Sequence, residues 1–147
     1  MRVVRVTSAE FDSAAELAPL GSVGGGAVAS FTGICRAEGG VTAIELEHYP
    51  GMTEASLAAL VDEAASRWSL LGAVLIHRVG YIAAGQPIVL VGTAASHRTE
   101  ALEACAFLID RLKTDTPFWK KEHRADCTAD WVDAKASDDA RADKWRD

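Results

Sequence analysis

The sequence predicts an α+β fold with a mostly antiparallel sheet, two main helices and a small additional β region. Segments with a strand pattern flank segments with a helical pattern, without the regular strand–helix alternation that a parallel βαβ sheet shows. Residues 42–49 alternate strictly, with Ile44, Leu46 and His48 on one face. Residues 53–68 carry one apolar stripe at helical spacing. We expect one domain of 147 residues, which is long enough to bury a core.

The first half of the chain is expected to form four elements before the first long helix. Residues 3–7 alternate like a strand, and residues 12–17 favour a short helix. A glycine-rich entry at 24–26 leads into a strand that runs to Gly33, and residues 36–40 favour a turn. Thr53 is the expected N-cap of the helix over 53–68, since a threonine hydroxyl can accept from the free N–H groups of the first turn.

The second half is expected to add strands at 73–79 and 88–94, joined through a glycine-proline turn at 85–87. A second long helix is predicted over 99–113, capped by Ser96 or His97 and prevented from continuing by Pro117. Two short strands follow at 118–122 and 128–133. The tail at 134–147 has eight charged residues of fourteen, so we expect it to be solvated or mobile, with Trp145 available to anchor it on a partner.

Composition excludes several classes of protein. The formal net charge of -6 argues against a general nucleic-acid binder, which would show a basic face. No apolar run approaches the roughly 18 residues of a membrane span, and the amino terminus has no signal-peptide pattern. We therefore expect a cytoplasmic protein that binds neither membrane nor nucleic acid.

The three cysteines are widely spaced and form no CxxC pair, so neither a disulfide framework nor a zinc site is expected. Cys105 falls within an apolar helical pattern and is expected in the core. Cys35 is expected to be structural as well, although the neighbouring Arg36 could lower its pKa. No metal and no other cofactor is predicted.

The segment from Arg111 to Arg124 concentrates five Lys/Arg against two acids in an acidic protein, which suggests an anion site. A solvated basic patch is the competing interpretation. Lys113 is expected to end the inward helical stripe made by Leu102, Cys105, Ala106 and Ile109, because eleven residues bring it back to within about 20° of Leu102. A lysine so placed lines a pocket, extends out along its stem or stabilises the helix end.

His97 and Arg98 precede the same helix, where free N–H groups and the helix dipole favour an anion. A plain capping role for His97 with a solvated Arg98 is the alternative. The helix between His97 and Lys113 is about 24 Å long, so both ends can hardly touch one small ligand in the same chain. If both are functional, a homodimer with a composite site between two copies is predicted.

Five short fragments occur in order along the chain: GICR at 33–36, LEHYPGMT at 46–53, IHRVG at 76–80, SHR at 96–98 and LKTDTPFWKKE at 112–122. With these fragments in this order, the chain resembles the catalytic (large) subunit family of molybdopterin synthase. The resemblance implies an α/β hammerhead-type fold. It also implies a sulfurtransferase that converts cyclic pyranopterin monophosphate to molybdopterin in molybdenum cofactor biosynthesis. The implied sulfur donor is the thiocarboxylate on the C-terminal Gly-Gly tail of a small ubiquitin-like partner, in a heterotetramer built on a central homodimer.

By position, the resemblance assigns catalytic roles to Lys113 and Lys120. The substrate-binding residues that it implies are these two lysines with Ile34, Cys35, Arg36, His97, Arg98, Lys121 and Glu122, and more weakly Lys135. Arg36, His97 and Arg98 suit a cyclic phosphate. Lys135 stands where relatives can have arginine, so it keeps the charge and loses the bidentate fork.

Two other functions stay open from the residues alone. A persulfide sulfurtransferase would carry sulfur on Cys35 or Cys105. A binding module would hold the phosphorylated metabolite or the ubiquitin-like protein without turnover.

Overall fold

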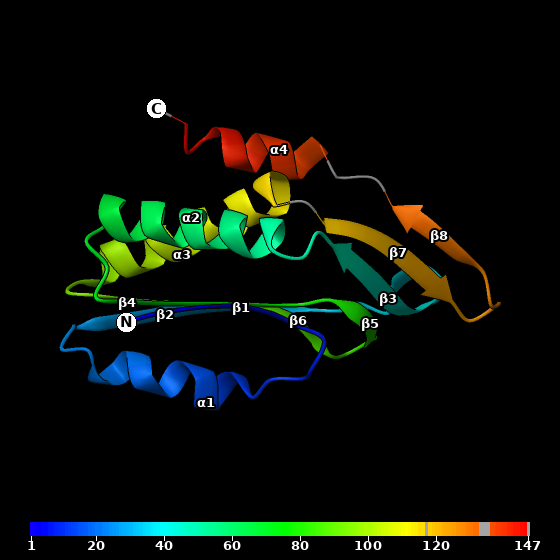
Figure 1. The fold of residues 1–147 in the computed structure, drawn as a ribbon, viewed down its shortest axis with the longest axis horizontal. Helices are drawn as coiled ribbons and strands as arrows, with labels where there is room; N and C mark the ends of the chain where they lie inside the picture. Colours follow the sequence, from blue (N-terminus) through cyan, green and yellow to red (C-terminus); the bar gives the residue numbers. More distant parts are fainter. Residues whose placement is uncertain (117, 133–135, 147) are drawn as a thin grey trace.

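The computed structural model describes residues 1–116, 118–132 and 136–146, whose elements are labelled in Figure 1. The strands are β1 (Arg2–Thr7), β2 (Ala27–Ile34), β3 (Val41–His48), β4 (Gly72–Arg78), β5 (Gly80–Ala83), β6 (Pro87–Ala95), β7 (Phe118–Arg124) and β8 (Ala129–Val132). The α-helices are α1 (Ser13–Leu17), α2 (Met52–Arg67), α3 (Arg98–Asp115) and α4 (Ala136–Asp143). Two short 3-10 segments, η1 (Ala18–Ser22) and η2 (Glu38–Gly40), complete the elements in these ranges.

The larger sheet has the strand order β1-β4-β6-β2. The pair β1–β4 is parallel, and β4–β6 and β2–β6 are antiparallel. Helices α2 and α3 cover one face of this sheet, and α1 with η1 lies against the other (Figure 1). This mixture of helices and mostly antiparallel strands confirms the predicted α+β class.

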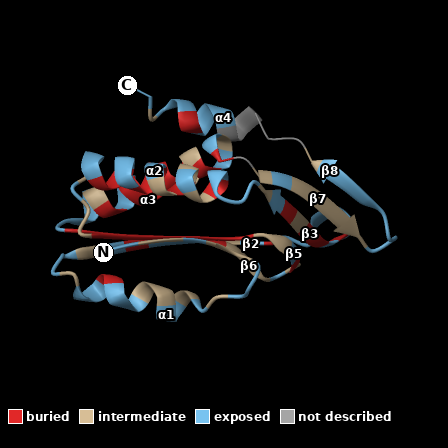
Figure 2. Cartoon of the chain, viewed as in Figure 1, coloured by how far each residue is buried: buried red, intermediate tan, exposed pale blue. Residues whose placement is uncertain are grey.

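The core lies on both faces of this sheet, which is why every residue of β4 is buried (Figure 2). Ala73 and Leu75 face α2 and α3 in a cluster that includes Leu57, Phe107 and Leu108. Val74 and Ile76 alternate with them and pack against Leu20 and its neighbours on the other side. A strand covered on both faces has a continuous apolar sequence, as residues 72–76 of β4 do. No helix in the described ranges has both the length and the apolar character needed to cross a membrane.

Gly92 of β6 shows how closely the η1 layer approaches the sheet. A Cβ at this position would lie 2.5 Å from the side chain of Leu17 and 2.8 Å from that of Leu20. Only a glycine fits such an approach without moving its neighbours.

The smaller sheet has the order β5-β3-β7-β8 and is antiparallel throughout. It has its own small core of Cys35, Val41, Ile44, Leu46 and Ile82. This sheet is the additional β region that the sequence predicts. It brings β7, which directly follows the end of α3, alongside β3 (Figure 1).

Three local expectations are wrong. Gly51 is the N-cap of α2, with a φ of 84°. Thr53 is instead fully buried within the helix, where its hydroxyl accepts from the Tyr49 N–H at 3.2 Å. Strand β5 also lies between the two strands expected at 73–79 and 88–94, so the turn at 85–87 joins β5 to β6.

The third correction concerns the C-terminal tail, in which residues 136–143 form helix α4 and pack against α3. Trp145 contacts its own chain: its ring lies 5.7 Å from that of Trp68 and 5.8 Å from that of Phe107. Its indole N–H donates to Asp110 at 2.8 Å, and Arg141 pairs with the same carboxylate at 3.3 Å. The high charge of the tail therefore does not prevent α4 from packing. Trp145 and the buried Asp110 hold it against α3.

Candidate active site

A cavity of about 500 Å³ lies between the two sheets at the C-terminal end of α3. Its lining residues come from strands β2, β3, β4, β6, β7 and β8, from helix α3 and from the segments that follow β2 and α3. They are Ile34, Cys35, Arg36, Glu38, Ile44, Leu46, His77, Ile88, Leu112, Lys113, Thr116, Phe118, Lys120, Glu122 and Val132. Six of the residues predicted for the site therefore meet here: Ile34, Cys35, Arg36, Lys113, Lys120 and Glu122.

Strand alternation decides which side chains of β7 reach this cavity. Lys120 stands opposite Leu46, and Glu122 stands opposite Ile44, so all four share one face of the smaller sheet. Leu46 and Ile44 are buried and form an apolar floor beside the two charged groups. Lys121 points to the other face, where its Nζ lies 4.7 Å from the ring centre of Trp131. The structure thus separates Lys121 from Lys120.

Lys113 lines the cavity from the last turn of α3, but the predicted inward stripe is wrong at Leu102, which is 60% exposed. Of the other stripe residues, Cys105 is buried and Ala106 and Ile109 are half-buried. The remaining buried residues of α3 are Ala101, Ala104, Phe107, Leu108, Asp110 and Leu112. Alanines allow the helix to approach β2 and β6 closely, so they occupy the face that hydrophobicity alone assigns to leucine. Lys113 is exposed and adjoins this buried face, at the point where the helix ends over the cavity.

The Cys35 side chain is buried, which agrees with the structural role expected of it, and its pKa is raised, so the lowering that Arg36 could have caused is not found. Burial raises the pKa of this thiol and outweighs the lowering effects of a hydrogen bond with the Ile44 backbone and of the Lys120 charge. The guanidinium of Arg36 pairs with Glu38 at 3.2 Å, and both side chains are largely exposed. Cys35 is therefore a protonated wall residue at neutral pH.

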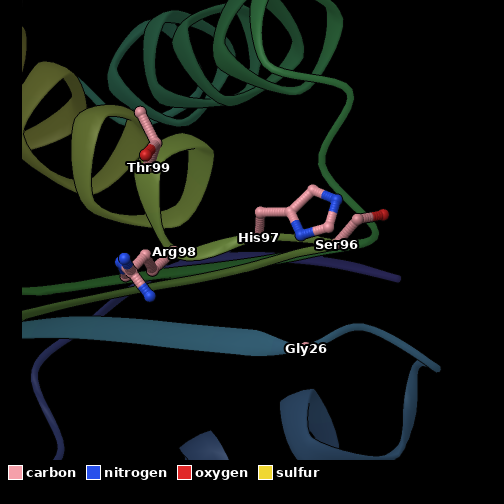
Figure 3. A pocket seen from close by; sticks show the side chains of 5 residues that line it. All are labelled: Gly26, Ser96, His97, Arg98 and Thr99. Carbon is pink, nitrogen blue, oxygen red and sulfur yellow. The ribbon is translucent and has the colours of Figure 1, made fainter.

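His97 and Arg98 lie at the opposite end of α3, in a second hollow of about 550 Å³ with Gly26, Ser96 and Thr99 (Figure 3). His97 is the N-cap in extended conformation and makes no capping hydrogen bond with its side chain. Its ring and the Arg98 guanidinium point away from each other (Figure 3). A Cβ at Gly26 would lie 2.6 Å from the Ser96 carbonyl oxygen, so glycine permits β2 to pass close beneath this corner.

Helix α3 separates His97 at one hollow from Lys113 at the other by about 24 Å along its axis. His97 and Arg98 thus do not meet Lys113 within one chain. Lys135 lies outside the described residues.

Sequence reasoning missed His77, which with Arg78 is one of two polar residues in the run at 73–79. His77 is 5% exposed, lines the cavity and stacks on Phe118, with ring centres 3.9 Å apart and an interplanar angle of 18°. Burial lowers the pKa of its imidazole to about 4, so the ring is neutral at physiological pH. A histidine that directly follows the apolar residues 73–76 is the feature of the sequence that could have pointed to it.

Comparison with known proteins agrees with the resemblance seen in the motifs. Residues 6–115 match the family described as MoaE protein. The molybdopterin synthase catalytic subunit of Mesorhizobium japonicum is 50% identical, over 97% of this chain and 92% of the relative.

Solved structures share the fold. The molybdopterin biosynthesis MoaE protein from Burkholderia ambifaria has a TM-score of 0.84 and 44% identity, covering 99% of this chain and 98% of that one. A complex of subunits 1 and 2 of the molybdopterin-converting factor from Helicobacter pylori has a TM-score of 0.72 at 22% identity, covers 90% of each chain and supports the fold alone. The chain therefore belongs to the MoaE protein family, the catalytic subunits of molybdopterin synthase, an enzyme of molybdenum cofactor biosynthesis.

Proposed function

We propose that this chain converts cyclic pyranopterin monophosphate to molybdopterin with sulfur from the C-terminal thiocarboxylate of a small ubiquitin-like partner. The observation that carries the proposal is the cavity at the end of α3, where Lys113 and Lys120 face an apolar floor and Arg36 lies at the edge. An apolar wall suits the flat pterin ring system, and the cations suit its phosphate and the carboxyl end of the incoming tail.

Lys113 and Lys120 supply positive charge where the reaction develops negative charge. Addition of sulfur opens the cyclic phosphate and leaves an anionic oxygen, which a nearby ammonium group stabilises or protonates. We assign the main catalytic role to Lys113, against the thiocarboxylate, and an orienting electrostatic role to Lys120. Ile34, Cys35 and Glu122 form the walls that hold the substrate.

His97 and Arg98, which also suit the phosphate, do not line this cavity in the described part of the chain. Their exposed side chains lie about 24 Å from Lys113 along α3. A two-fold homodimer brings the start of α3 from one copy to the end of α3 from the other, which completes the site. The small ubiquitin-like subunit then delivers its tail to each composite site.

The test is molybdopterin formation by the purified chain with cyclic pyranopterin monophosphate and thiocarboxylated small subunit. Lys113→Ala should reduce the rate by about 100-fold or more, since removal of one group that stabilises developing charge has effects of this size. Lys121→Ala is the matched control, because Lys121 is only eight positions away and faces Trp131 on the other side of the sheet. Near-normal rates in Lys113→Ala, or equal losses in both variants, would overturn the assignment.

A further inference from the structure

The turn between β5 and β6 carries Gln86 and lies next to residues that line the cavity. It comprises residues 84–86, and the Gln86 N–H donates back to the Ala83 carbonyl at 3.1 Å. Gly85 has a φ of 89°, in the left-handed region that glycine adopts without strain. The Gln86 side chain is half-buried. The turn is therefore tight, and its one long polar side chain is held within the fold.

The main chain of this turn makes two hydrogen bonds with Cys35. The Cys35 N–H donates to the Gln86 carbonyl at 2.9 Å, and the Gly85 N–H donates to the Cys35 carbonyl at 2.7 Å. The register between β2 and β6 shifts at the end of β2, directly before these bonds. The regular ladder therefore ends here, and the turn continues the pairing of residues 34–36, all three of which line the cavity.

The Gln86 side chain joins the turn to two further elements. Its Oε1 accepts from Nη1 of Arg78, the last residue of β4, at 3.1 Å. Its Nε2 donates to the carboxylate of Glu10, between β1 and α1, at 2.8 Å. A guanidinium only donates and a carboxylate only accepts, so these two partners fix which way the amide points. One amide group thus connects the turn to both elements.

The burial of Arg78 makes this connection hard to replace. Arg78 is 5% exposed, and its Nε has no hydrogen-bond partner in the described part of the chain. Removal of an acceptor from a buried cation is strongly destabilising. The Gln86 oxygen is such an acceptor, so the native fold favours one position for this amide and for the turn that carries it.

We propose that Gln86 is a positioning residue that fixes the cavity wall at 34–36, and thereby the place of Arg36 at the cavity edge. This inference rests on the proposed function for its catalytic meaning, because Arg36 is there a cation that suits the phosphate of the substrate. The Arg36 guanidinium pairs with Glu38 at 3.2 Å, and both side chains are largely exposed. An exposed ion pair does little to fix a side chain, so the backbone bonds at Cys35 supply the order.

The first experiment measures the dissociation constant of cyclic pyranopterin monophosphate by calorimetry, without the sulfur donor. Gln86→Leu removes both side-chain hydrogen bonds and should raise this constant about tenfold. In an Arg36→Ala background the same change should raise it by less than about twofold, because Arg36 no longer contributes. The same factor in both backgrounds would mean that Gln86 acts on the fold as a whole, and would refute the proposal.

Exchange of the two polar groups provides a rescue. Gln86→Glu still accepts from Arg78 but places its carboxylate against that of Glu10, so substrate binding should weaken. Adding Glu10→Gln restores a donor and an acceptor with their places exchanged, and binding should recover. Glu10→Gln alone keeps an acceptor for the Gln86 amide and is the matched control, with near-normal binding expected. A double variant no better than Gln86→Glu would contradict the proposed link.

A second measurement covers the case in which substitution of Gln86 prevents folding. Glu10 is exposed, and Glu10→Ala removes only the acceptor of the Gln86 amide. Hydrogen exchange of the Cys35 amide, followed by NMR, should then become about tenfold faster. The amide of Val91, at the centre of β6, should be unaffected. Unchanged exchange at Cys35 would overturn the proposal. This measurement needs no substrate, so the proposal about Gln86 and the proposed reaction can fail independently.

Discussion

Lys113, Lys120 and Lys121 lie within nine residues of one another, yet the fold gives them three different surroundings. Lys113 is carried by the end of a helix, and Lys120 by the inner face of a strand. Lys121 is turned to the outer face by the simple alternation of that strand. Position in the fold, and not local charge density, thus decides which of these lysines lines the cavity.

At the same scale, Cys35 distinguishes a thiocarboxylate-fed enzyme from a persulfide carrier. Burial raises the pKa of its thiol, which disfavours the thiolate that sulfur chemistry on cysteine requires. We expect Cys35→Ser to form molybdopterin from thiocarboxylated partner at a rate close to that of the unchanged chain. Cys127→Ser, at an exposed cysteine, is the control. Loss of activity in Cys35→Ser alone would favour the persulfide mechanism.

At the scale of elements, α4 is stabilised by contacts concentrated at its end. Trp145 packs on Trp68 and Phe107 and donates to the buried Asp110. The Arg67 guanidinium also donates to the Trp145 carbonyl at 3.0 Å. An eight-residue helix is too short to be stable alone, so these tertiary contacts account for its formation.

Trp145→Ala should therefore lower the free energy of unfolding by about 2 kcal/mol, because it removes a half-buried indole and leaves Asp110 with one partner fewer. Trp131→Ala, at a tryptophan that is 54% exposed, should change it by less than about 0.5 kcal/mol. Urea unfolding of both variants provides the comparison. Equal, small effects would mean that α4 contributes little to the stability of the chain.

At the scale of the whole molecule, α3 keeps two cationic hollows apart, one at each end. A single chain holds both halves of the proposed site without bringing them together. The length of α3 is thus the structural reason for proposing that activity depends on a second copy.

Mixing two inactive variants tests this directly. We expect Lys113→Ala and Arg98→Ala each to be nearly inactive, and an equal mixture to regain about a quarter of full activity after subunit exchange. Half of the dimers then contain one intact composite site and one doubly altered site. The activity of each variant alone, treated in the same way, is the control. A mixture no more active than its components would contradict a shared site.

The sequence by itself determined the class of fold, the positions of both long helices and the cationic segment around Pro117, because these depend on short-range periodicity and on breakers. The separation of His97 from Lys113 also followed from helix length alone. Ordered motifs pointed to the family and to six of the fifteen residues that line the cavity.

Tertiary structure alone decided the rest. Ala101 and Ala104 lie on the buried face of α3 and Leu102 is exposed, since close approach of the helix to the sheet favours small side chains. Desolvation, which depends on neighbours far along the chain, raises the pKa of Cys35 and lowers that of His77, so the His77 ring is neutral. Pairing of β7 with β3 brought Lys120 to Leu46, and no local pattern encodes that distance of seventy-four positions. Burial and strand pairing depend on the whole packed molecule. They place Lys113 and Lys120 of the basic segment in one cavity with residues from distant strands.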